Sequence, residues 1–159
     1  LRDSVADLET LEGRIMTLEL PVGERGERTV AGIRVRAMST GHSGMSEIQN
    51  YMYLLAWNGL TLFHEGDAAI PRETFASWDL ASADIDIAFL HWGLLANPDW
   101  MRFLDEAVGP GHYFPMHVSP SQEREAAPRL EALARENPRV HYLRRSMDRV
   151  VLSSLALQE

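Results

Sequence analysis

Apolar and polar residues alternate through the first half of the chain as they do in half-buried β-strands. Residues 14–20 (RIMTLEL) and 33–37 (IRVRA) place apolar side chains at every second position, which gives a strand one buried and one solvated face. The polar residues 23–27 (GERGE) between them predict a turn. Residues 50–57 and 60–63 flank an Asn-Gly pair, the strongest short-range signal for a β-hairpin.

In the second half of the chain, helical and strand patterns alternate. We expect a short helix at residues 71–80, beginning at a proline, a helix from Asn97-Pro98 to about residue 108, and an Ala-rich helix at 121–136. Strands are expected at residues 85–90 (IDIAFL), 112–118 (HYFPMHV), 140–143 and 150–152. This order of elements, with strands first and then strands that alternate with helices, predicts a layered α/β protein. No repeat or linker interrupts the pattern, so residues 1–159 are expected to form a single domain.

Composition excludes several classes of function. The chain has 159 residues, enough for one core-forming domain, and no cysteine, which excludes disulfides, thiolate metal sites and a cysteine nucleophile. It has no lysine, so Schiff-base chemistry and a P-loop lysine are excluded as well. The net charge of −8 argues against binding to nucleic acid. The apolar runs are too short for a membrane span and the first residues do not resemble a signal peptide, so we expect a cytoplasmic protein without a membrane partner.

Three potential metal ligands each follow a predicted strand. His42 lies in a Ser-Thr-Gly-His-Ser-Gly loop after a strand expected to end near Met38, Asp67 follows the second strand of the hairpin, and His117 lies at the end of HYFPMHV. Loops at the carboxyl ends of strands converge in layered α/β folds, and sites gather there. Imidazole and carboxylate are suitable ligands for Zn²⁺. The pattern therefore indicates a metal site at one edge of the sheet.

Each residue also has a simpler interpretation. Asp67 could cap the helix expected at Pro71, and His117 could hydrogen-bond a neighbouring carbonyl. Two further histidines lie near the expected site. His91 could serve as a hydrogen-bond donor or substrate contact beside the ligands, and His64 could hydrogen-bond near them, although a structural role is favoured for His64.

Four segments carry a resemblance to a known family. GIRVRAMSTGHSG, NYMYLLAWNGLTLFHEGDA, IDIAFLHWG and YFPMHVSP resemble, in this order, the C-terminal half of the metallo-β-lactamase-fold hydrolases, and in particular their small, lactonase-like branch. The resemblance implies an αββα sandwich of which this chain is the C-terminal half. It also implies a metal-dependent hydrolase in which a metal-bound hydroxide attacks a small ester, lactone or phosphoester.

The resemblance also implies roles for the three ligands. His42 would bind a first metal ion, Asp67 would bridge both ions as the catalytic carboxylate, and His117 would bind the second. Zinc is the expected ion, with two ions in the complete site; manganese or iron would accept the same donors.

One family signature is missing from the sequence. The motif His-x-His-x-Asp-His, which supplies the remaining ligands, does not occur in these 159 residues. We therefore expect the chain to be inactive alone and to expose an apolar sheet face, which an N-terminal half or a second chain, including a second copy of this one, would cover. The alternative is a non-catalytic remnant or interaction module with an incomplete metal site.

Overall fold

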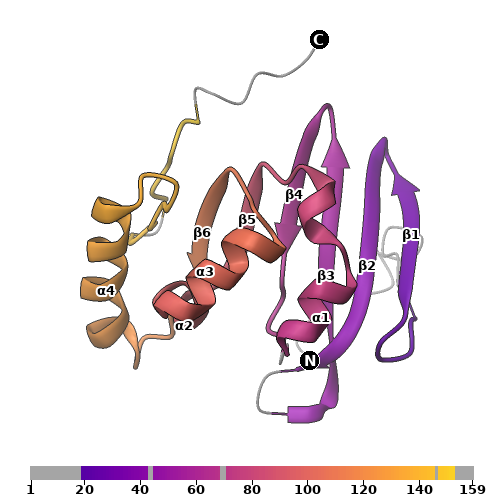
Figure 1. The fold of residues 1–159 in the computed structure, drawn as a ribbon, viewed down its shortest axis with the longest axis horizontal. Helices are drawn as coiled ribbons and strands as arrows, with labels where there is room; N and C mark the ends of the chain where they lie inside the picture. Colours follow the sequence, from indigo (N-terminus) through magenta and orange to yellow (C-terminus); the bar gives the residue numbers. More distant parts are fainter. Residues whose placement is uncertain (1–18, 43–44, 69–70, 146, 153–159) are drawn as a thin grey trace, which may run out of the picture.

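A mixed six-stranded β-sheet organises the part of the chain that the structure describes. The computed structural model describes residues 19–42, 45–68, 71–145 and 147–152. Within them, six strands follow one another across the sheet in chain order (Figure 1). They are β1 (Arg25–Val30), β2 (Ile33–His42), β3 (Met45–Trp57), β4 (Leu60–His64), β5 (Ile87–His91) and β6 (His112–Met116).

The sheet changes direction in its middle. Strands β1 to β4 form an antiparallel meander, whereas β5 and β6 run parallel to β4. The connections into the parallel part carry the helices α1 (Arg72–Ser77), α2 (Trp92–Leu95) and α3 (Pro98–Ala107) and the 3₁₀-helix η3 (Leu80–Ala83), and α4 (Glu123–Glu136) follows β6. The α/β class predicted from the sequence is confirmed. In the described part of the chain, every helix is too short or too polar to cross a bilayer.

Two of the connections in the antiparallel part are tight turns within the described residues. Asn58 and Gly59 have positive φ angles of 49° and 75°, as a two-residue hairpin with the favoured twist requires, and the predicted β3–β4 hairpin is confirmed. Ala31 and Gly32 turn in the same way between β1 and β2, with φ of 51° and 81°. The turn predicted at residues 23–27 is wrong beyond its first two residues, because β1 begins at Arg25. This polar edge strand carries too little apolar signal to be recognised as a strand from the sequence.

The helices cover one face of the sheet. Figure 1 shows α1, α2 and α3 in front of the strands. The core between these layers contains Met52, Phe63, Leu90 and Tyr113 from the sheet, each completely buried, and Phe75 and Leu104 from the helices. The amphipathic pattern of α3, with Met101 and Leu104 buried, places its apolar side against this core.

The two closing strands predicted from the sequence are wrong. Val140 forms one isolated parallel bridge with Tyr113, and neither residues 140–143 nor 150–152 form a strand. The chain leaves the sheet here because Tyr142 packs against a second small core formed by Trp92 and α4. The strand predicted at residues 14–20 lies outside the described residues except for its last two, which are not in a strand.

The opposite face of the sheet is apolar and only half-buried. The strand register aligns Val35, Leu55 and Leu62 in one row across β2, β3 and β4. The next row contains Tyr53, His64 and Phe89. None of these six side chains is fully buried within the described structure, whereas Ile87, which continues the first row on β5, is buried. That a further segment or chain covers this face stays a prediction.

Candidate functional site

Two of the predicted ligands meet at the carboxyl ends of the strands. His42 Nε2 lies 3.1 Å from Asp67 Oδ2, and an isolated antiparallel bridge pairs His42 with Ala68. His42 is the last residue of β2 rather than part of a loop, because β3 is long enough to pair with β2 as far as Met45. The β2–β3 register shifts between Gly41 and His42, an irregularity of the kind that re-aims a side chain.

Asp67 is presented by a tight turn after β4. Gly66 has a φ of +69°, a conformation that glycine adopts without steric cost. Its N–H donates to His64 Nδ1 at 2.9 Å, and its carbonyl accepts from His117 Nε2 at 2.8 Å. Both backbone hydrogen-bonding groups of Gly66 are therefore held by histidines, one from β4 and one just after β6.

Glu65 anchors the same turn to β5 from within the protein. Its side chain is 1% exposed, and its Oε1 accepts the His91 N–H at 2.9 Å. Its Oε2 is buried without a hydrogen-bond partner in the described structure. Burial raises the pKa of Glu65 to about 8, and the negative charge of Asp67 acts in the same direction. At neutral pH this carboxyl is therefore mostly protonated.

Asn50 of β3 also contacts the turn. Its Oδ1 accepts the Asp67 N–H at 2.9 Å, and its Nδ2 donates to the Glu65 carbonyl at 3.3 Å and to Thr40 Oγ1 at 3.0 Å. Sequence reasoning missed both Asn50 and Glu65. The available signal for these two residues was their position, since each is a polar residue at the start or end of an otherwise apolar predicted strand. This position does not show which turn the residue contacts.

The remaining histidines at this edge surround the turn. The rings of His91 and His117 stack with centroids 5.9 Å apart. Burial lowers the pKa values of His64 and His91, and the nearby His117 lowers both further. Each accepts a backbone N–H at Nδ1, His91 from Gly93 and His64 from Gly66, as a neutral imidazole can. The structural role favoured for His64 fits these contacts.

Two simpler interpretations can be compared with the structure. His117 does hydrogen-bond a neighbouring carbonyl, that of Gly66. Asp67 does not cap α1, because Pro71 is the N-cap residue and no side chain forms a capping hydrogen bond there. A separate histidine pair, His112 Nδ1 and His141 Nε2 at 2.9 Å, lies at the amino end of β6, away from this turn.

The described donors fit part of a metal site. Two atoms bound to one zinc ion at about 2.0–2.2 Å, at an angle of about 90–110°, lie about 3.0–3.5 Å apart. The His42–Asp67 separation of 3.1 Å is within this range. His117 Nε2 instead contacts the Gly66 carbonyl, and no three His, Asp or Glu side chains of the described residues are grouped to hold a metal ion. The pair therefore has suitable chemistry and spacing, and the full ligand set remains a prediction.

Comparisons with known proteins found matches among solved structures alone. No protein-family model matches the chain, and no curated protein matches it. Solved structures that match part of this chain include three that are named as metallo-β-lactamase proteins. The metallo-β-lactamase fold protein YhfI from Bacillus subtilis is 12% identical, with a TM-score of 0.48, over 87% of this chain and 59% of its own.

The other two of these three structures match smaller parts of this chain. A proposed Zn-dependent hydrolase of the metallo-β-lactamase superfamily from Thermotoga maritima is 17% identical, with a TM-score of 0.42, over 62% of this chain and 48% of its own. A metallo-β-lactamase from Erythrobacter litoralis is 18% identical, with a TM-score of 0.36, over 67% of this chain and 45% of its own. The chain thus spans about half the length of the structures that it matches.

Proposed function

We propose that this chain supplies part of the metal centre of a hydrolase, with His42 and Asp67 as ligands of one divalent cation. The observation that supports the proposal is the 3.1 Å separation of His42 Nε2 and Asp67 Oδ2 at the carboxyl ends of the strands. His117, hydrogen-bonded to the residue before Asp67, would act as a further ligand after giving up this hydrogen bond. Zinc suits these donors, and manganese or iron would accept them.

The residues of the site have distinct tasks in this proposal. A divalent cation in such a site lowers the pKa of water and polarises the oxygen of an ester, lactone or phosphoester. Asp67 contributes a negative charge that offsets the charge of the cation, and His42 contributes a neutral donor. Glu65 and Asn50 hold the turn that presents Asp67. A rigid turn keeps the carboxylate in place without a reorganisation cost.

The proposed centre needs donors from elsewhere. The 159 residues contain no His-x-His-x-Asp-His motif, and no third His, Asp or Glu side chain of the described residues is grouped with His42 and Asp67. We propose that a further polypeptide segment, an N-terminal half or a second chain, supplies the other ligands and covers the apolar face of the sheet. Hydrolysis of a small-molecule substrate would require both parts.

Zinc titration of the purified chain tests the ligand assignment. We expect the wild-type protein to bind zinc and His42→Ala to bind it at least about 100-fold more weakly, more than the roughly 10–100-fold typical for partners outside the ligand set. His141→Ala is the matched control, since it removes an imidazole at the amino end of β6 and should leave the affinity unchanged. Equal zinc affinity in wild type and His42→Ala would contradict the assignment.

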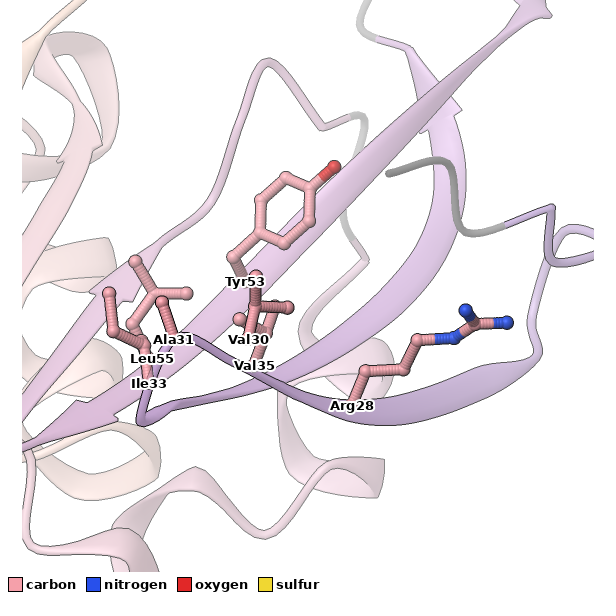
Figure 2. A pocket seen from close by; sticks show the side chains of 7 residues that line it. All are labelled: Arg28, Val30, Ala31, Ile33, Val35, Tyr53 and Leu55. Atoms are coloured by element: carbon pink, nitrogen blue, oxygen red, sulfur yellow. The ribbon is translucent and has the colours of Figure 1, made fainter. Parts of the chain in front are cut away.

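One observation favours a second candidate function, that of an interaction module. A cavity of about 350 Å³ opens on the half-buried face of the sheet, lined by Val30, Ile33, Val35, Tyr53 and Leu55 with Arg28 and Ala31 (Figure 2). Figure 2 shows Arg28 directed away from the apolar side chains, which lie together over β2 and β3. An open apolar surface of this kind favours association. In this alternative, two copies of the chain associate through the face.

Sedimentation velocity over a range of concentrations tests this association. We expect the wild-type chain to form a dimer at tens of micromolar, and Leu55→Glu to remain monomeric because a carboxylate on the apolar face cannot be desolvated cheaply. Val22→Glu is the control, since Val22 is 64% exposed and lies beside a different cavity, near Met38 and Pro71. A wild-type chain that stays monomeric and folded at high concentration would exclude self-association as its function.

A further inference from the structure

The side chain of Asn50 lies where the β3–β4 ladder would otherwise continue. The ladder pairs Tyr53 with His64, and the same register extended along β3 would place Asn50 opposite Asp67. Strand β4 ends at His64, so no backbone ladder forms beyond that point. The Asn50 amide replaces it by accepting the Asp67 N–H at 2.9 Å and donating to the Glu65 carbonyl at 3.3 Å.

The turn and Asn50 are also matched in shape. A Cβ atom on Gly66 would lie 2.5 Å from Asn50 Oδ1 and 2.6 Å from the Tyr51 carbonyl oxygen. The turn therefore lies directly against β3. Thr40, the cross-strand partner of Asn50 on β2, holds the other side of the amide through its Oγ1 at 3.0 Å. The amide is thus fixed between the strand that carries His42 and the turn that carries Asp67.

We infer that Asn50 is a positioning residue that sets where the Asp67 carboxylate lies relative to His42. A side-chain amide has one acceptor and two donors, and here Oδ1 holds the turn through the Asp67 amide while Nδ2 holds it through the Glu65 carbonyl. Alanine at this position would leave both backbone groups without these partners, and Asp67 would lose its fixed distance to His42. The consequence for cation binding rests on the proposed function; the positioning itself does not.

Amide hydrogen exchange tests the positioning in metal-free protein. We expect the Asp67 N–H to exchange at least about tenfold faster in Asn50→Ala than in wild type. Asn50→Asp keeps the Oδ1 acceptor and should retain most of the protection. Tyr113→Phe is the matched control for a general loss of stability, because it removes the hydrogen bond from the Tyr113 hydroxyl to Asp105 near the amino end of β6 and leaves the Asn50–Asp67 hydrogen bond in place. Asp67 N–H exchange that is equally fast in Asn50→Ala and Tyr113→Phe would overturn the inference.

Zinc affinity gives the second measurement. Asn50→Ala should weaken zinc binding about 10- to 100-fold, as loss of a residue that orients a ligand does, while Tyr113→Phe stays within about twofold of wild type. Wild-type protein that binds no zinc would refute the proposed function alone, and the exchange experiment would still decide the role of Asn50. Zinc affinity unchanged in Asn50→Ala, in protein whose wild type does bind zinc, would overturn the positioning role.

Discussion

Glu65→Gln is expected to stabilise the metal-free protein by about 5 kcal/mol at pH 8 and above. Burial raises the pKa of Glu65 from 4.5 to about 8, so the folded state binds this proton more tightly than the unfolded state. The stabilisation that comes from this tighter proton binding at Glu65 is fully present below pH 4.5. It is lost as the pH rises to about 8, at about 1.4 kcal/mol of unfolding free energy per pH unit. Glutamine has no proton to lose and keeps an acceptor for the His91 N–H.

Chemical denaturation between pH 4.5 and 9, with a chelator present, measures this effect. The difference in unfolding free energy between the two proteins should be near zero at pH 4.5 and grow to its full value near pH 8. Glu65→Ala is the control. It should be less stable than wild type at pH 4.5, since it leaves a cavity and removes the acceptor of the His91 N–H. If the unfolding free energies of wild type and Glu65→Gln change with pH in parallel, the Glu65 carboxyl is not protonated in the folded protein.

Gly66→Ala is expected to destabilise the protein by about 3 kcal/mol or more and to disrupt the candidate site. Holding a residue other than glycine at positive φ costs of order 1 kcal/mol or more. The added Cβ would also lie 2.6 Å from the Tyr51 carbonyl oxygen, a backbone atom that cannot rotate away. The turn must therefore move, and it would take Asp67 away from His42.

Gly41→Ala provides the matched control for Gly66→Ala. Gly41 is the neighbour of His42, a Cβ there would meet none of the described atoms within 4 Å, and its φ is not positive. We expect its unfolding free energy to stay within about 0.5 kcal/mol of wild type. If both alanine variants unfold at the same denaturant concentration, the turn at Gly66 does not have the tight packing that we describe.

Local signals in the sequence predicted the parts of the fold that depend on neighbouring residues. The Asn58-Gly59 pair forms the expected hairpin because both residues adopt positive φ. The helix at Asn97-Pro98 begins as expected, since the Asn97 side chain accepts two backbone N–H groups. The positions of His42 and Asp67 at strand ends were predictable for the same reason, although β2 is longer than expected.

Other features depend on contacts between distant residues and were not predictable from local pattern. The predicted strand at residues 140–143 is wrong, because Tyr142 packs against α2 and α4 rather than continuing beside β6. Glu65 has its role only because the His91 N–H lies opposite it, 26 positions along the chain. Asn50 contacts a turn 17 positions away. His117 was predicted as a ligand, but its contact with the Gly66 carbonyl depends on how β6 lies beside the turn.

Anomalous diffraction at the zinc edge, from crystals of the chain grown with zinc, tests the central claim most directly. We predict a zinc peak about 2.0–2.2 Å from both His42 Nε2 and Asp67 Oδ2. A peak at the His112–His141 pair alone, or none within bonding distance of Asp67, would contradict the account.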